Sequence, residues 1–260
     1  MKANYHNHTF RCHHAYGCEW EYVEKAIAEG LEVFGFADHT AMCFPPEHKT
    51  ITRMTIERMG EYVETINRLK KQYADRITIL CGLEAEYFPA LFGEYLEVLR
   101  QLKGLDYLIL GQHYLDNEYD NPVHCIKDTE EPARLTQYVN QVTEGMETGC
   151  FLYLAHPDVL KFTGDAAFYK QEMRRLCRNA KALNLPLELN LQGLRSGKHY
   201  PYRPFWELAA EENCAVVIGC DAHRVRDVAD PLELEQIDGF IQELGLQVVD
   251  EIDLKGDFLK

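Results

Sequence analysis

Short apolar runs recur along the chain, and a longer segment with helical spacing follows most of them. Between the runs, apolar residues recur three and four positions apart, as in Ile56, Met59, Tyr62, Val63, Ile66 and Leu69. Runs that are apolar on both faces suit parallel strands covered by helices. The pattern therefore predicts an α/β fold of repeated βα units, either a barrel or a doubly wound sheet. The expected strands are residues 3–6, 33–38, 78–83, 107–111, 152–155, 187–191 and 216–220.

The domain organisation is expected to be simple. No Pro/Gly/Ser-rich linker, low-complexity tract or repeat of fixed period interrupts the pattern over the 260 residues. Single α/β barrels often reach about 200–250 residues. We therefore expect one domain over residues 1–260.

The charge balance limits the classes of binding partner that we expect. There are 42 acidic and 27 basic residues, a net charge of −15. Because nucleic-acid affinity rests on Lys and Arg against phosphates, a long nucleic acid or an anionic membrane surface is not expected as a partner. The N-terminus lacks the apolar core of a signal peptide, and no apolar run approaches the roughly 18–20 residues of a membrane span.

The cysteines point to a reducing compartment. Nine cysteines without any CxxC spacing make a poor disulfide framework, so we expect a cytoplasmic protein whose cysteines are mostly core residues. Cys12 and Cys18 lie close to histidines and are kept as alternative metal ligands. The cysteines expected in the core are Cys81, Cys150, Cys214 and Cys220.

Imidazole and carboxylate side chains follow nearly every predicted strand. In parallel α/β folds the carboxyl ends of the strands open on one face, so these side chains are expected to converge there. Within one strand, residues two apart share a face, as in His6-Asn7-His8. The converging set is His6, His8, His39, Glu84, His113, His156, Asp221 and His223.

This mixture of side chains suggests a metal centre. Imidazole with carboxylate suits zinc, manganese or iron, whereas calcium and magnesium prefer oxygen shells. The set exceeds the four ligands of a structural zinc site. Two or three ions bridged by a carboxylate suit phosphate-ester hydrolysis. The sequence thus predicts a hydrolase with two or three divalent ions (zinc, manganese or iron) and no organic cofactor.

The strand ends carry six motifs, which are His6-Asn7-His8-Thr9, Phe36-Ala37-Asp38-His39, Gly82-Leu83-Glu84, Gly111-Gln112-His113, Ala155-His156-Pro157-Asp158 and Gly219-Cys220-Asp221-Ala222-His223. These motifs resemble those of the polymerase and histidinol phosphatase (PHP) family. Residues 12–15 and 187–201 are most similar to its monofunctional histidinol-phosphate phosphatases. The resemblance implies a distorted seven-stranded (β/α) barrel, similar to a TIM barrel, with a trinuclear site. It also implies hydrolysis of L-histidinol phosphate in histidine biosynthesis by a metal-bridging hydroxide, without a phosphoenzyme.

The resemblance also implies a ligand for each position, with Glu84 as the bridging carboxylate. Many family members have an acidic residue where His14 aligns, and His13 is the alternative there. The implied ligands are His6, His8, Glu84 and Asp221 for the first ion, Glu84, His113 and His156 for the second, and His14, His39 and His223 for the third.

Other residues are candidates for substrate binding and proton transfer. Arg195, in a glycine-flanked loop, is predicted to clamp the phosphate, because a planar guanidinium fits its geometry. Lys161 is a second candidate cation, and Arg224 either orients the substrate or pairs with an acidic neighbour. Asp158 and Tyr114 are candidate acids or partners of a ligand, with a helix cap and a packed aromatic ring as the structural alternatives.

The remaining histidines are given no role. His48, His124 and His199 do not follow a predicted strand and are expected in loops, with His199 at most at the edge of the pocket. Glu86 shares a face with Glu84 and is expected to support a ligand rather than bind metal.

Three alternative functions stay open. A nucleotide or phosphotyrosine would be another small phosphate ester for the same site. An amidohydrolase-type barrel also begins with His-x-His and ends with Asp, but His14, His39 and His223 favour phosphate chemistry. A metal-stabilised binding module is the non-enzymatic alternative. The sequence does not indicate an oligomeric state.

Overall fold

A curled parallel β-sheet forms the centre of the protein. The computed structural model describes residues 1–120, 122–254, 256 and 258–259. The first four strands pair in chain order, and Val33 lies between Ala3 and Thr78 in the register. These strands are β1 (Ala3–Asn4), β2 (Val33–His39), β3 (Thr78–Ala85) and β4 (Tyr107–Leu110). A second parallel group consists of β7 (Leu187–Asn190), β8 (Ala215–Gly219) and β9 (Gln247–Val248).

Single bridges connect the two groups of strands. Leu154 bridges in parallel to Leu110 on one side and to Leu187 on the other. At the opposite edge, Asn7 bridges to Ala222. The sheet therefore curls round, which agrees with the predicted α/β class and favours the barrel over the doubly wound sheet. Of the expected strands, residues 152–155 alone form no regular strand, and Leu154 is their one bridging residue in the described part of the chain.

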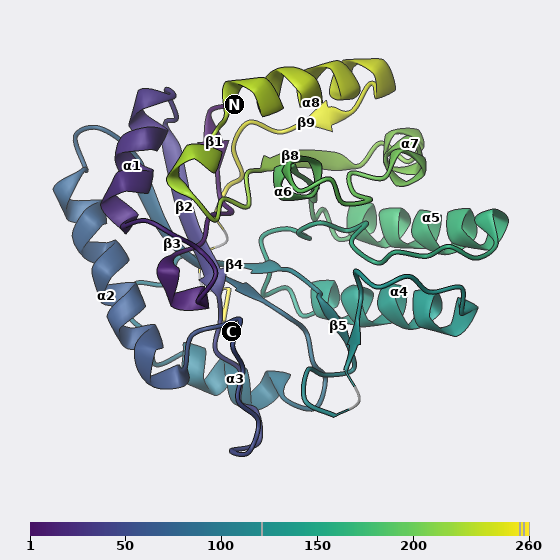
Figure 1. Cartoon of the computed structure of the whole chain (residues 1–260), viewed down its shortest axis with the longest axis horizontal. Helices are drawn as coiled ribbons and strands as arrows, with labels where there is room; N and C mark the ends of the chain where they lie inside the picture. The colour runs from purple at the N-terminus through teal and green to yellow at the C-terminus, as the bar shows by residue number, and fades with distance from the viewer. Residues whose placement is uncertain (121, 255, 257, 260) are drawn as a thin grey trace.

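Helices cover the outside of the curled sheet (Figure 1). The predicted apolar stripe on residues 56–69 lies on α2, whose Met59, Tyr62 and Ile66 are buried. That one-sided burial explains why this segment is helical. The α-helices are α1 (Glu19–Ala28), α2 (Ile56–Gln72), α3 (Phe92–Leu99), α4 (Pro132–Glu147), α5 (Ala166–Ala182), α6 (Leu191–Arg195), α7 (Arg203–Glu211) and α8 (Pro231–Leu244), and the 3₁₀ turns are η1 (Phe10–Cys12) and η2 (Val225–Asp227).

A small hairpin after β4 was not predicted. Strands β5 (Tyr114–Leu115) and β6 (Val123–His124) pair antiparallel, with Tyr114 opposite His124. Two-residue strands carry too little alternation to be recognised in a sequence. The hairpin follows closely after β4 in the chain, so it lies near the carboxyl end of that strand.

The cysteines and helices can be compared with the expectations. Cys12 is buried and Cys18 is exposed. None of the helices in the described ranges combines the length and apolar character needed to cross a bilayer. The four cysteines expected in the core, Cys81, Cys150, Cys214 and Cys220, are buried as predicted.

Candidate metal centre

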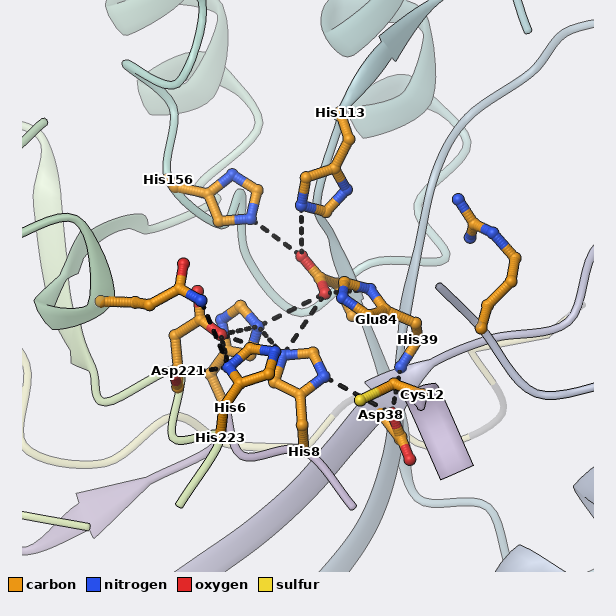
Figure 2. A network of polar contacts seen from close by, with 12 residues as sticks. His6, His8, Cys12, Asp38, His39, Glu84, His113, His156, Asp221 and His223 are labelled. Atoms are coloured by element: carbon orange, nitrogen blue, oxygen red, sulfur yellow. Dashed lines mark hydrogen bonds and ion pairs between the residues drawn. The ribbon is translucent and has the colours of Figure 1, made fainter. Parts of the chain in front are cut away.

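The side chains that follow the strands converge at the carboxyl end of the sheet (Figure 2). Register explains part of this convergence, because His39 at the end of β2 lies directly opposite Glu84 on β3. Residues after β1, β4, Leu154 and β8 supply the others. Figure 2 shows His6, His8, His39, Glu84, His113, His156, Asp221 and His223 pointing toward a common centre.

Glu84 lies at the middle of this cluster. Its Oε2 lies 2.7 Å from His39 Nδ1 and 3.5 Å from His6 Nε2. Its Oε1 lies 2.8 Å from His156 Nε2 and 3.6 Å from His113 Nε2. One buried carboxylate therefore meets imidazoles on both of its oxygens, which is the geometry that a bridging ligand needs.

Asp221 forms a second centre within the cluster. Its Oδ1 lies 3.0 Å from His8 Nε2, 3.4 Å from His223 Nδ1 and 3.7 Å from His6 Nε2. The donor atoms of His6, His8 and Asp221 all lie within 4.8 Å of one another. These three residues could share one ion.

Two more sets of donor atoms meet the same 4.8 Å limit near His39. One set is His39, Glu84 and His113, and another is His8, His39 and His223. His14 stacks on His223, with ring centroids 4.7 Å apart. The structure thus brings His14 to the cluster and places His39 against Glu84 as well as beside His223.

Cys12 also lies beside this cluster. Its sulfur forms one compact set of donor atoms with His14 and His223, and a second with His8 and Asp38. Its thiol also donates to the Thr9 carbonyl at 3.2 Å. Cys12 therefore lies close enough to the cluster to remain an alternative ligand.

Two glycines in the sequence motifs make room for buried carboxylates. A Cβ at Gly111 would overlap the Glu84 carboxylate, and a Cβ at Gly219 would overlap that of Glu188. Both glycines have ordinary φ values, so space rather than backbone freedom explains them. The Gly-Gln-His and Gly-Cys-Asp motifs therefore combine a ligand with the space that its neighbour needs.

The cluster fits bound cations. Among the described residues, His223 Nε2 is buried without a hydrogen-bond partner, and the buried Glu84 Oε2 and Asp221 Oδ1 approach imidazole nitrogens without making a hydrogen bond. Leaving such atoms buried without a partner is costly. Imidazole nitrogen and carboxylate oxygen are both ligands of divalent transition metals. Divalent metal ions would give these converging atoms the partner that the protein does not provide.

The electrostatics of the cluster support the same conclusion. Burial by itself lowers the pKa of His6, but Glu188, Asp221 and Glu84 outweigh it and raise that pKa to about 10. Burial favours a protonated Glu84, yet His39 and His113 hold the pKa of that carboxyl well below its ordinary value. The carboxylates therefore stay anionic and need positive charge beside them.

Two further acidic residues, Glu188 and Asp38, contact the histidines of the cluster. Glu188 Oε1 lies 2.8 Å from His6 Nδ1, and Glu188 Oε2 accepts the backbone N–H of His156 at 3.0 Å. Asp38 Oδ1 lies 3.5 Å from His8 Nδ1. A carboxylate on one ring nitrogen leaves the other nitrogen available for a metal. Glu188 was not among the predicted site residues, although one carboxylate in an apolar strand is a recognisable signal.

A cavity of about 300 Å³ opens over the cluster. The candidate residue Tyr114 lies in its wall, together with residues that were given no role from the sequence, notably Arg53, Gln192, Lys198 and Tyr200. The wall consists of His14, His39, Thr52, Arg53, His113, Tyr114, His124, Ile126, Val159, Gln192, Lys198, Tyr200, Asp221 and His223.

Arg195 does not line this cavity, so its predicted contact with phosphate needs correction. It is the last residue of α6 and points toward α8, where its Nε lies 2.7 Å and its Nη2 2.8 Å from the Glu233 carboxylate. Its Nη2 also donates to the Cys220 carbonyl at 3.1 Å. The guanidinium is committed to an ion pair that joins two helices. Lys198 and Arg53 are the cationic side chains of the wall.

The other two predicted cations also lie outside the cavity wall. Lys161 Nζ pairs with Asp128 at 2.8 Å and lines a separate cavity. Arg224 is exposed, and its guanidinium lies 6.0 Å from the centre of the Tyr16 ring. Neither placement supports contact with a ligand over the metal cluster.

Asp158 has a structural role at the start of a helix, which was the alternative to its role as an acid. It is buried, and its Oδ2 accepts the backbone N–H of Tyr202 at 2.6 Å and the indole N–H of Trp206 at 3.0 Å. Tyr202 is the N-cap residue of α7. Burial raises the pKa of Asp158 to about 6. The side chain therefore fixes the start of α7, and Asp158 is not part of the cavity wall.

Glu86 holds the backbone beside the proposed ligand His113. Its Oε2 accepts the backbone N–H groups of His113 at 3.0 Å and Tyr114 at 2.9 Å. Its Oε1 lies 2.6 Å from Arg53 Nη2. Arg53 also pairs with Glu118, so its charge is already balanced within the protein.

Comparison with known proteins agrees with this geometry. The family model described as "PHP domain" matches residues 4–192. The "Probable histidinol-phosphatase" of Deinococcus radiodurans is 28% identical over 228 residues, which cover 86% of this chain and 86% of that protein. The histidinol-phosphatase of Bacillus subtilis is 27% identical over 261 residues, which cover 88% and 96%.

A solved structure has the same fold. The crystal structure of histidinol phosphate phosphatase from Lactococcus lactis, complexed with zinc, L-histidinol and phosphate, superposes with a TM-score of 0.74 at 20% identity. The match covers 97% of this chain and 98% of that one. The family match extends over most of the strand-end motifs from His6 onward. The chain therefore belongs to the PHP domain family.

Proposed function

We propose that this protein is a metal-dependent phosphomonoesterase that hydrolyses L-histidinol phosphate to L-histidinol and phosphate. The observation that carries the proposal is the Glu84 carboxylate, which meets imidazoles on both oxygens below a cavity of about 300 Å³. Relatives named histidinol-phosphatase align with 86–88% of the chain. The Lactococcus lactis relative binds zinc, L-histidinol and phosphate.

We further infer that residues 1–260 form one distorted seven-stranded barrel. The bridges of Leu154 to Leu110 and Leu187, and of Asn7 to Ala222, support this closure.

A cytoplasmic location is supported by the cysteines, all of which are free.

The cluster would hold up to three divalent ions, and zinc, manganese and iron all suit its ligands. When bound, the ions would neutralise phosphoryl oxygens and activate water as the nucleophile. The sharing of His39 and His8 between sets of donor atoms supports closely spaced ions. The proposed ligands are His6, His8, His14, His39, Glu84, His113, His156, Asp221 and His223.

Other side chains of the cavity would bind and orient the ester. Lys198 is exposed at the cavity wall and takes the phosphate-binding role that Arg195 cannot fill. Burial raises the pKa of Tyr114, so its phenol keeps its proton at neutral pH and can donate a hydrogen bond to the leaving oxygen. Glu188 and Asp38 keep the rings of His6 and His8 turned toward the cluster.

A substrate panel with metal analysis tests the proposal. Protein loaded with zinc or manganese should release phosphate from L-histidinol phosphate far faster than from nucleoside monophosphates or phosphotyrosine. Equal turnover of all the esters would contradict the substrate assignment. Absence of turnover with every ester and metal would contradict the phosphatase assignment itself.

A further inference from the structure

The β5–β6 hairpin brings His124 to the wall of the cavity, although the sequence gave it no function. Two contacts fix its position. Its ring centroid lies 4.7 Å from that of Tyr114, its register partner, and the N–H of the next residue, Cys125, donates to the His113 carbonyl at 2.8 Å. The His124 ring is therefore held close to His113, a residue of the cluster.

A backbone hydrogen bond determines which nitrogen of His124 carries a proton. The backbone N–H of Ile126 donates to His124 Nδ1 at 3.3 Å. A ring nitrogen that accepts a hydrogen bond has no proton, so in the neutral ring the proton is on Nε2. His124 is thus a neutral donor with one N–H group.

His124 differs from the neighbouring imidazoles in its contacts with carboxylates. His39 and His113 face the Glu84 carboxylate, and His223 faces Asp221. In the ranges that the structure describes, His124 has no ion pair with a carboxylate. Its Nε2–H is accordingly a donor that a ligand in the cavity can use.

We propose that His124 is a substrate-binding residue that donates its Nε2–H to an oxygen of the phosphoryl group. This inference rests on the proposed phosphatase function, because it needs a phosphoryl group over the metal cluster. Lys198 lies in the same wall and would add a charge to this uncharged donor. Together they form the part of the phosphate site that consists of protein rather than metal.

Two substitutions separate this role from a structural one. His124→Asn places an oxygen near the position of Nδ1 and can keep the hydrogen bond from Ile126, but it lacks the distal donor. His124→Gln places an amide nitrogen near the position of Nε2 but gives up the hydrogen bond within the turn. A role in substrate binding and a role in stabilising the turn therefore predict opposite orders for the two variants.

The measurement is binding of inorganic phosphate to the metal-loaded protein by calorimetry, with metal content and Tm recorded for each variant. Loss of a hydrogen bond to a charged group should weaken phosphate binding by about tenfold or more in His124→Asn, whereas His124→Gln should stay within about threefold of the parent. The same order is expected for KM of the ester. Phosphate binding by His124→Asn equal to that of the parent, or affinities that follow Tm, would overturn the proposal. If the parent binds phosphate but hydrolyses no ester, the proposed function fails while the binding comparison still decides the role of His124.

Discussion

His39 and Glu84 lie opposite each other in the parallel register of β2 and β3, and their Nδ1 and Oε2 atoms are 2.7 Å apart. Two neighbouring strands thus end in a pair of proposed ligands at the same level. The rest of the cluster is built around this pair, because the other Glu84 oxygen meets His156 at 2.8 Å. Changes that move Glu84 should therefore affect the whole metal centre.

Gly111→Ala tests the space that Glu84 occupies. A Cβ at residue 111 would overlap the Glu84 carboxylate, so we expect the variant to lose bound metal and most of its activity while it keeps its far-UV circular dichroism. Metal content after desalting provides the measurement. Gly239→Ala on α8 is the matched control, since a Cβ there meets nothing within 4 Å and should stabilise the helix by about 0.5–1 kcal/mol. Full metal content in Gly111→Ala would contradict the packing argument.

Glu188→Gln tests the support behind His6. Loss of the carboxylate should weaken metal binding by about 10–100-fold, because the amide holds the ring of His6 less firmly in its orientation. Competition with a chelating dye measures this affinity. Glu211→Gln, on the exposed end of α7, should leave it unchanged. Unchanged affinity in Glu188→Gln would show that His6 needs no such partner.

Lys198→Ala and Arg195→Ala distinguish the two candidates for the phosphate-binding cation. Lys198→Ala should lower kcat/KM by about tenfold or more, mainly through KM, because it removes a charged donor from the cavity. Arg195→Ala should lower Tm, through loss of its contacts with Glu233 and Cys220, and leave kcat/KM within about threefold. The opposite pattern in steady-state kinetics would restore Arg195 as the phosphate clamp.

Asp158→Asn tests the buried carboxyl at the start of α7. Since burial raises the pKa of Asp158 from 3.8 to about 6, its charged form costs stability above pH 6, and the cost disappears as pH falls toward 4. The stability of Asp158→Asn relative to the parent should therefore rise by about 2.4 kcal/mol from pH 4 to pH 8. Urea denaturation at both pH values measures the difference. A difference that does not change with pH would contradict the burial argument, and near-complete loss of activity at pH 7 would restore Asp158 as an acid.

The convergence of the proposed ligands could be predicted because it depends on a short-range pattern. Each apolar run marks a strand, and parallel strands end at one edge, so residues directly after the runs must meet. His39, Glu84 and Asp221 follow this rule. It needs no knowledge of how the helices pack.

The substrate residues could not be predicted in the same way. Arg195 follows a strand too, but its direction depends on the packing of α6 against α8, where Glu233 lies 38 positions further along the chain. His124 depends on a hairpin of two-residue strands, which leaves no periodic signal. These side chains are placed by long-range contacts, and spacing alone does not encode them.

The most direct test of the central claim is metal reconstitution of the parent and Glu84→Ala, with Glu64→Ala as a control on the exposed face of α2. After chelation, zinc or manganese should restore hydrolysis of L-histidinol phosphate in the parent and in Glu64→Ala. Glu84→Ala should bind less metal and stay at least about 100-fold less active, because it lacks the carboxylate that the imidazoles share. Full metal content and activity in Glu84→Ala, or hydrolysis by the chelated parent without added metal, would contradict a metal-dependent phosphatase centred on Glu84.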